Sequence, residues 1–343
     1  MTQAPASLSH SRVAITPALR AVVDRLDHTT RHQAAYHFGW ITAEGAPASA
    51  AAGKAVRPAL ALLSAEASGA TSQVALPGAV AVELVHNFSL IHDDLMDGDE
   101  ERRHRPTVWK LWGASSAILT GDALLALAQE VLLESELPTA VAAAGLLARA
   151  TRHLIRGQVQ DVSFERRTSV PVEDCIDMAA GKTGALLSAS VAIGAVLAGA
   201  PAPVVEALSF YGARLGLAFQ LIDDILGIWG DPAVTGKPVH SDLRVRKKSL
   251  PISYALGEGG PASRELATWL AAPPAPDPAA VHTEAEFLRV AGLIEAAGGR
   301  QWAAAKAARC MERGQAALES VELDGAARDE LISLGHFIVD RKT

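Results

Sequence analysis

Two acidic clusters each follow a long apolar stretch of this chain. The first is Asp93-Asp94-Leu95-Met96-Asp97, and the second is Asp223-Asp224-Ile225-Leu226-Gly227. The apolar residues before them recur at helical spacing, which predicts core helices that carry carboxylates at their C-terminal ends. Residues four apart share a helix face, so Asp93 and Asp97 can point at one site, and Asp223 can do the same from another helix. Unpaired charge is costly at the end of a core helix, so these carboxylates need a partner.

Hard divalent cations suit such carboxylates. Mg²⁺ binds through one or two carboxylates and completes its shell with water and substrate phosphates. Carboxylates that face each other across a cavity therefore suggest a diphosphate held between them. An acidic pair on a helix is more often a solvated face, but the apolar residues before both clusters argue against that alternative here.

Composition predicts an all-α protein. The chain has 343 residues, of which 49% are hydrophobic and 20% are charged, so it can bury a large core. Alanine and leucine dominate, aromatic residues make up 5%, and few stretches alternate with period two. No break in composition separates two domains. We therefore expect a flexible N-terminal tail over residues 1–15 and one all-α domain over residues 16–343.

Charge and cysteine content limit the partners and the compartment. A net charge of −7 disfavours nucleic acid or an anionic membrane as the general partner. Cys175 and Cys310 lie far apart in sequence and make no disulfide framework, which indicates a reducing, cytoplasmic compartment. The N-terminus does not read as a signal peptide. Residues 184–205 carry no charge and could span a bilayer, but their serines, small residues and prolines favour a buried core helix, so we expect no transmembrane segment.

Basic residues cluster near both acidic motifs and before an apolar stretch. Lys54 and Arg57 are three apart, where they could hold a phosphate, and His86 lies two turns before Asp93 on the same face. Each alone is more often a surface pair or a satisfied core histidine. The other candidates are Arg102, Arg103, Lys182, Lys237 and Lys247.

In their joint order, these segments resemble the class I trans-isoprenyl diphosphate synthases, the polyprenyl synthetase family. The resemblance runs from about Arg20 to the C-terminus. It rests on GKAVRP (53–58), ELVHNFSLIHDDLMDGDEERRHRPTVW (83–109), GD (121–122), GKTGALL (181–187) and FQLIDDILGIWGDPAVTGKPVHSDLRVRKKSLP (219–251). It implies the isoprenoid synthase fold, a single large helical bundle around a deep central cavity, and a homodimer.

The resemblance also implies a reaction: Mg²⁺-dependent condensation of isopentenyl diphosphate with an allylic diphosphate. Three Mg²⁺ ions are expected with substrate bound, two on Asp93 and Asp97 and one on Asp223. The allylic diphosphate would be gripped with help from Arg102, Lys182 and Lys237, and Lys247 is a further substrate-binding candidate. The isopentenyl diphosphate would be held by Lys54, Arg57, His86 and Arg103, with Phe219 near its hydrocarbon and the oxygens of Thr183 and Gln220 facing the allylic cation.

One position departs from the family pattern. The second motif usually ends in a third aspartate, but Gly227 stands there. Asp223 remains, so we expect the third Mg²⁺ to take water in place of the missing carboxylate. We interpret Asp231, which precedes a proline, as a turn residue.

Product length is expected to depend on residues one turn below Asp93. Phe88 and Ser89 lie five and four residues before it. An aromatic at the former position alone, without an insertion between Asp93 and Asp97, is similar to the short-chain pattern of archaeal-type geranylgeranyl diphosphate synthases. We therefore favour a twenty-carbon product, with farnesyl diphosphate as the nearest alternative.

Two other classes stay open. A class I terpene cyclase would share the metal chemistry but needs no isopentenyl diphosphate site, so Lys54, Arg57, His86 and Arg103 argue against it. A non-catalytic partner subunit would normally have lost an acidic motif, and Gly227 is the only hint of such a loss.

Overall fold

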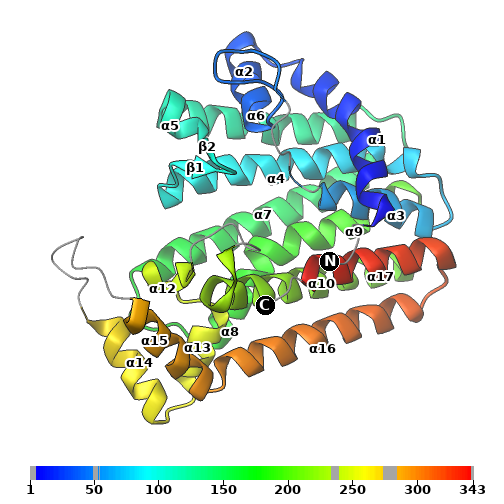
Figure 1. The fold of residues 1–343 in the computed structure, drawn as a ribbon. Coiled ribbons are helices and arrows are strands. Elements are labelled where there is room, and N and C mark those ends of the chain that lie inside the picture. The colour runs from blue at the N-terminus through cyan, green and yellow to red at the C-terminus, as the bar shows by residue number, and fades with distance from the viewer. Residues whose placement is uncertain (1–4, 49–52, 54, 233–238, 273–283, 341–343) are drawn as a thin grey trace. The chain divides into compact units, whose positions relative to one another are not determined.

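The chain is helical almost throughout, which confirms the all-α prediction. The computed structural model describes residues 5–48, 53, 55–232, 239–272 and 284–340 (Figure 1). Within these ranges the only strands are the two-residue β1 (Glu101–Arg102) and β2 (Arg105–Pro106), which pair antiparallel as a hairpin. Lys54 and Lys237 lie outside the described residues.

The chain divides into two compact units. The first unit comprises residues 1–151, 189–209 and 318–334, and the second comprises residues 152–188, 210–317 and 335–343. The unit boundaries fall inside five helices: α7 (Ala140–Glu165), α9 (Ala185–Leu197), α10 (Ala202–Trp229), α16 (Gly299–Glu319) and α17 (Gly325–Val339). The single domain over residues 16–343 stays a prediction.

The first unit is built around the helix that carries the first acidic cluster. It contains α1 (Ala6–Val23), α2 (His28–His37), α3 (Val56–Ala67), η1 (Ser72–Ala75), α4 (Leu76–Asp97), α5 (Val108–Trp112) and α6 (Ala114–Leu133). Helix α4 packs along α6 and against α3 (Figure 1). It has a proline in its first turn and ends at Gly98, whose left-handed φ of 71° suits the end of a helix.

Helix α1 begins inside the segment that we expected to be a flexible tail. It starts at Ala6, and its buried residues Leu8, Ser11, Ile15, Leu19 and Val23 recur every three or four positions. This periodicity places one face of α1 in the core of the first unit. The expectation for residues 6–15 therefore missed an amphipathic pattern that the sequence contains.

The second unit holds the second acidic cluster. Its complete helices are α8 (Val172–Ala179), the π-helix η2 (Ala180–Gly184), α12 (Ser241–Arg244), α13 (Leu250–Gly257), α14 (Pro261–Ala271) and α15 (Glu284–Ala296). One core cluster joins Ile228 of α10 to fully buried residues of α12, α13, α14 and α15, among them Leu243 and Ile252. The cluster ties the segment after α10 to the helix that bears the acidic motif.

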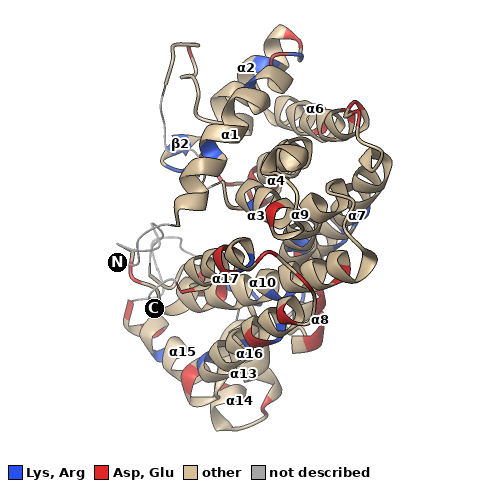
Figure 2. Cartoon of the chain, turned by 90° about the vertical axis from the view of Figure 1, so that its right-hand side faces the viewer, with Lys and Arg blue, Asp and Glu red and all other residues tan. Residues whose placement is uncertain are grey.

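Three helical stretches are long and apolar enough to cross a membrane by length and composition alone: residues 72–97, 114–133 and 172–197. In the first and third stretches, 67% of the most apolar 18-residue segment is buried within the protein. The uncharged segment 184–205 is interrupted after Leu197, because α9 ends there and α10 begins at Ala202. Helix α9 carries no charged side chain and is drawn in tan in Figure 2.

Candidate active site

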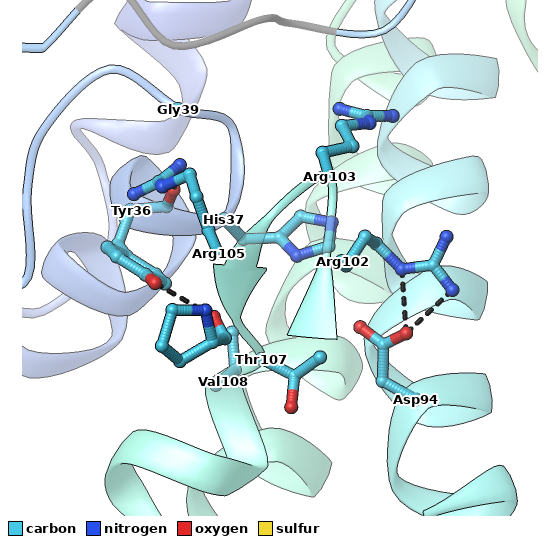
Figure 3. A pocket seen from close by; sticks show the side chains of 10 residues that line it. Tyr36, His37, Gly39, Asp94, Arg102, Arg103, Arg105, Thr107 and Val108 are labelled. Carbon is cyan, nitrogen blue, oxygen red and sulfur yellow. Dashed lines mark hydrogen bonds and ion pairs between the residues drawn. The ribbon is translucent and has the colours of Figure 1, made fainter. Parts of the chain in front are cut away.

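The three aspartates of the first cluster have different environments. At the end of α4, Asp93 is half-buried and Asp97 is exposed, whereas Asp94 is 1% exposed. Arg102 reaches back from β1 and places two guanidinium nitrogens 2.6 Å from Oδ1 of Asp94 (Figure 3). Burial raises the pKa of Asp94, and Arg102 opposes that shift. Asp94 is therefore a structural anchor for the hairpin, and Asp93 and Asp97 remain one turn apart on the helix.

A strained turn in the hairpin sets the position of Arg103. Arg102 pairs with Arg105, so Arg103 and His104 are the two central residues, with φ of 54° and 61°. Two left-handed central residues define the type I′ turn, which normally uses glycine or asparagine. Other residues bear a cost of about 1 kcal/mol each in this conformation. Strain of this kind persists where the surrounding structure fixes the residue, often at a functional site.

Left-handed backbone recurs in the motif segments. The non-glycine residues with positive φ in the described ranges are Ala55, Arg103, His104, His240 and Arg246. All five lie in segments 53–58, 83–109 and 219–251, which carry the family resemblance. The unusual backbone thus falls in the loops for which the sequence predicted chemistry.

Gly53 and Arg103 bring two motifs together. A Cβ on Gly53 would lie 2.9 Å from Nη2 of Arg103, so the guanidinium packs directly on the glycine backbone. Arg12 of α1 donates to the carbonyl of Gly53 at 3.0 Å and so binds the same segment. The start of the GKAVRP motif is therefore shaped to receive an arginine from the hairpin.

Three predicted isopentenyl diphosphate ligands form one electropositive group. Burial lowers the pKa of Arg57, and the carboxylate of Glu83 opposes that shift. Burial also lowers the pKa of His86 well below its ordinary value, and the charges of Arg57 and Arg103 add to this effect. The pKa of Arg103 is lowered by burial and by neighbouring Arg102. The positive charges of Arg57 and Arg103 both act on His86, and positive charge of this kind favours a nearby anion.

Two further residues belong to this group and were missed by the sequence analysis. Asn87 accepts a hydrogen bond at 3.1 Å from Nε2 of His37 on α2, and its amide donates to the backbone and side chain of Glu83 at 2.8 and 3.2 Å. Burial lowers the pKa of His37 to about 3, with Arg102 and Arg103 contributing. Asn87 lies inside a quoted motif and could have been found there, but nothing in the sequence connects His37 to it.

A small pocket opens beside this group. His37, Asp94, Arg102, Arg103, Arg105 and Thr107 are among the residues that line it (Figure 3). Arg105 lies over the ring of Tyr36 at 4.0 Å and donates to the carbonyls of Tyr36 and Ile41 at 2.9 and 3.0 Å. The hydroxyl of Tyr36 donates to the carbonyl of Pro106 at 2.8 Å. These bonds hold β2 against α2 and so fix the wall of the pocket.

In the second unit, glycines bring backbone segments into close approach around Lys182 and Thr183. A Cβ on Gly157 of α7 would lie 2.2 Å from the backbone nitrogen of Lys182, and one on Gly216 of α10 would lie 2.6 Å from Cα of Gly184. Lys182 and Thr183 sit on the π-helix η2, and such single π turns are frequent at functional sites. The GKTG motif is thus held between two helices by backbone packing.

A line of hydrogen bonds joins predicted residues of the second unit. Thr183 Oγ1 donates to Gln220 Oε1 at 2.8 Å, and Gln220 Nε2 donates to Asp224 Oδ1 at 2.8 Å. Lys182 Nζ lies 2.6 Å from Asp161 Oδ2, a carboxylate that the sequence analysis did not single out. The structure therefore brings Thr183 and Gln220 together, with both oxygens oriented by neighbours. Phe219, the residue before Gln220, is half-buried on α10.

Lys247 is surrounded by carboxylates. Burial alone would lower its pKa, but Asp242, Asp224, Asp161 and Asp223 together raise it above its ordinary value. Asp224 is 3% exposed and accepts from the backbone N–H of Leu250 at 2.9 Å. Burial raises the pKa of Asp224, while Lys247 lowers it. In both acidic clusters the second aspartate, Asp94 or Asp224, is thus buried and hydrogen-bonded. The first aspartate, Asp93 or Asp223, is half-buried.

Comparison with known proteins decides the family. The polyprenyl synthetase family profile matches residues 40–284. A (2E,6E)-farnesyl diphosphate synthase of Mycobacterium tuberculosis is 53% identical over 96% of this chain and 90% of its own length. A geranylgeranyl diphosphate synthase of the same organism is 42% identical over 98% of this chain and 94% of its own. A solved polyprenyl synthetase from Streptomyces coelicolor is 55% identical with a TM-score of 0.94, covering 97% of this chain and 99% of its own.

The chain belongs to the polyprenyl synthetase family.

The donor chemistry of this polyprenyl synthetase fits the Mg²⁺ that the family uses. No group of three or more His, Cys, Asp or Glu residues in the described ranges is arranged to hold a metal ion by itself. Asp93 and Asp97 are two carboxylates one turn apart, at half-buried and exposed positions. Mg²⁺ is usually bound in this way, through one or two carboxylates with water and substrate phosphate in the remaining positions.

The chain-length candidates of the synthetase lie on one turn of α4. Phe88 is 5% exposed and meets the ring of His92 edge-on, with 4.9 Å between centroids. Nε2 of His92 lies 3.1 Å from the carbonyl of Ile118, and a Cβ on Gly121 would lie 2.2 Å from the same nitrogen. Ser89 is buried and donates to the carbonyl of His86 at 2.8 Å. Gly121 of the quoted GD motif therefore makes room for His92, which supports Phe88.

Proposed function

We propose that this protein is a trans-prenyltransferase that condenses isopentenyl diphosphate with an allylic diphosphate. The observation that carries the proposal is the group of Arg57, His86 and Arg103 in the first unit. His86 lies on α4, the helix that also carries Asp93 and Asp97, whereas Arg57 lies on α3 and Arg103 on the hairpin that follows α4. A polyprenyl synthetase with this basic group has a site for a second diphosphate in addition to the one that metal ions hold. A terpene cyclase has no use for that second site.

The basic group would bind the diphosphate of isopentenyl diphosphate. Arg57 and Arg103 supply positive charge and paired N–H donors that match phosphate oxygens. His86, with its depressed pKa, is neutral and would act as a hydrogen-bond donor through one ring nitrogen. Lys54 is expected to take part from the GKAVRP segment. Asn87 is hydrogen-bonded to both His37 and Glu83, and these three residues would keep this wall in place.

The acidic motifs would bind the cofactor. Asp93 and Asp97 in the first unit and Asp223 in the second would hold Mg²⁺, and we expect three ions with substrate present. Mg²⁺, when bound, supplies positive charge that stabilises a leaving diphosphate. Arg102, Lys182, Lys237 and Lys247 would add to that charge. This is electrostatic stabilisation of charge that develops in the transition state.

The chain's own residues would then guide the carbon chemistry. The carbon–oxygen bond of the allylic substrate breaks, and its electron pair leaves on the diphosphate. The oxygens of Thr183 and Gln220, oriented by their mutual hydrogen bond, would face the allylic cation. The double bond of isopentenyl diphosphate attacks that cation, and a proton is lost to the released diphosphate. Holding both substrates at reacting distance supplies much of the rate increase.

Farnesyl diphosphate is the product that the comparisons favour. The relatives named farnesyl diphosphate synthase share 53% identity over 96% of this chain, against 42% for the first geranylgeranyl diphosphate synthase. Our twenty-carbon prediction rested on Phe88 and is the less well supported alternative. We propose a fifteen-carbon product, a homodimeric assembly and a cytoplasmic location.

A product assay tests the proposal. Purified protein is incubated with Mg²⁺, isopentenyl diphosphate and, in turn, dimethylallyl, geranyl or farnesyl diphosphate, and the products are identified by mass spectrometry. We expect farnesyl diphosphate from the first two primers. Asp93→Ala should lower turnover about a hundredfold to a thousandfold without unfolding the protein. Cyclised products made without isopentenyl diphosphate would contradict the proposal, and so would near-normal turnover in Asp93→Ala.

A further inference from the structure

The first unit has a further cavity, between α1, α3 and the first half of α17. Helix α1 lines it with Ser7 and Ser11, α3 with Leu62 and Glu66, and α17 with Glu330. The cavity holds about 580 Å³, a volume typical of sites for small ligands. None of its lining residues belongs to the segments that carry the family resemblance. The proposed function therefore leaves this cavity without a role.

Two hydroxyls of α1 are buried at this cavity without a hydrogen-bond partner. The side chain of Ser11 is 2% exposed, and neither its Oγ nor that of Ser7 is hydrogen-bonded within the described residues. The two serines are four residues apart, so they share one face of the helix. By contrast, the hydroxyls of Ser9 and Thr16 donate to carbonyls of α1 at 2.8 and 2.6 Å. Because buried polar groups are normally hydrogen-bonded, the hydroxyl of Ser11 indicates a partner in the cavity.

Carboxylates set the charge of the cavity. Glu66, Asp324 and Glu330 line it, and no lysine or arginine is among its lining residues in the described part of the chain. Glu330 accepts a hydrogen bond from the backbone N–H of Ser7 at 3.3 Å, and Asp324 accepts one from the N–H of Ala327 at 3.0 Å. These bonds fix two of the carboxylates but bring no positive charge. The cavity therefore favours a cationic ligand.

The lining groups suit an ammonium group better than a metal ion. Nowhere in the described ranges are three or more His, Cys, Asp or Glu residues arranged to hold a metal. A primary ammonium has three N–H donors and no acceptor, so it can donate to carboxylates and to a hydroxyl at once. Beside these acceptors, the buried side chains of Leu62, Leu63, Ala59 and Ala327 give the cavity an apolar wall. This wall can take up a short hydrocarbon chain.

We propose that this cavity binds an aliphatic primary amine, whose ammonium group donates to Ser11 and to the carboxylates of Glu66 and Glu330. Its carbon chain lies on the leucines of α3. The inference goes beyond the proposed function, because it uses none of the residues assigned to the diphosphates, to Mg²⁺ or to chain length. Helix α1 joins the two sites, since Arg12, next to Ser11 in sequence, donates to the carbonyl of Gly53.

Calorimetric titration of the full chain tests this site without any turnover. The probe is 1,4-diaminobutane, and its bis(trimethylammonium) analogue carries the same charge without an N–H donor. Both are titrated at constant ionic strength, because general attraction to a protein of net charge −7 would bind them equally. Ser11→Ala removes the hydroxyl, and Glu330→Gln removes one carboxylate. Glu322→Gln removes the same charge from an exposed residue outside the cavity and is the matched control.

We expect saturable binding of the diamine by the wild type, with the N-methylated analogue bound about tenfold more weakly or worse. Glu330→Gln should lower the affinity about tenfold or more, and Ser11→Ala about threefold to tenfold, as losses of a charged and a neutral hydrogen bond. Glu322→Gln should bind like the wild type. Thermal melting without ligand checks that each variant folds, and Glu66→Gln repeats the test from α3 if Glu330→Gln does not fold.

Three results would each overturn the proposal. The first is a wild type that does not bind the diamine. The second is equal affinity for the diamine and its N-methylated analogue, which would mean general charge attraction only. The third is a folded Glu330→Gln or Ser11→Ala protein that binds as tightly as Glu322→Gln. None of these results bears on the condensation reaction, so the amine site and the proposed function can fail separately.

Discussion

The guanidinium of Arg102 lies 2.6 Å from the buried carboxylate of Asp94 and ties the β1–β2 hairpin to the end of α4. Asp94 is 1% exposed at its side chain and Arg102 is 30% exposed, so the pair is buried on one side only. This contact gives the middle residue of the acidic motif a structural task. It also places the neighbouring Arg103 over Gly53.

Arg102→Ala should therefore lower the free energy of unfolding of the protein as well as its activity. Removing the guanidinium leaves the Asp94 carboxylate buried without its cation, which costs about 2 to 3 kcal/mol for a charged group. Urea unfolding measures the change in the free energy of unfolding. Lys110→Ala breaks the exposed pair between Lys110 and Glu100 and should cost less than about 1 kcal/mol. Equal stability in the two variants would contradict a structural task for Asp94.

Gly53→Ala should act through Arg103. The added methyl would lie 2.9 Å from Nη2, so the guanidinium must move away from the predicted diphosphate site. We expect the KM for isopentenyl diphosphate to rise about tenfold, the cost of one weakened charged hydrogen bond, with a smaller change for the allylic substrate. Steady-state kinetics with each substrate varied in turn measures this. Gly292→Ala on α15, where an added Cβ meets nothing, is the control. A matching rise in both KM values would argue against a separate isopentenyl site.

Phe88→Ala should lengthen the product if Phe88 limits the growing chain. Truncation removes a ring that packs on His92, and each methylene that enters the new space gains about 0.8 kcal/mol. Mass spectrometry should then show products longer than the wild-type chain. Phe287→Ala removes a buried aromatic of the second unit, 2% exposed, and should destabilise the protein by about 3 to 5 kcal/mol without changing product length. Unchanged product length in a folded Phe88→Ala protein would make Phe88 ordinary core packing.

Acid should destabilise the protein through His37. Its pKa falls from an ordinary 6.5 to about 3 in the folded state, so the unfolded chain binds more protons between these two values. The contribution of the neutral His37 to the free energy of unfolding is therefore fully present above pH 6.5. It is lost as the pH falls from 6.5 toward 3, by up to about 1.4 kcal/mol per pH unit for one proton. The depressed pKa of His86 acts in the same direction.

Urea unfolding at several pH values measures this slope. His37→Gln removes the titrating group and should flatten the slope by as much as one proton. His28→Gln, at the exposed start of the same helix, is the matched substitution against which the slope of His37→Gln is compared. An unchanged slope in His37→Gln would mean that the buried ring at position 37 does not carry the acid sensitivity.

The sequence by itself determined the class of the protein and the residues that matter within each helix. Apolar periodicity predicted helices, and the i, i+4 spacing placed Asp93 and Asp97 on one face, because these relations are local and follow from helix geometry. The ordered motifs predicted the family, which the comparisons confirm. The same reasoning overlooked the apolar face of α1 at residues 8–23, where a local pattern was present but was taken for a tail.

The tertiary structure decided which residues from distant segments meet. The bond between His37 and Asn87, the packing of Arg103 on Gly53 and the carboxylate of Asp242 on Gly227 join positions 50, 50 and 15 residues apart. No helical or strand period relates such positions, because loops and hairpins set their separation in space. Each contact depends on a left-handed turn, a glycine without a side chain or a buried polar partner. Those features acquire meaning only when the chain is folded.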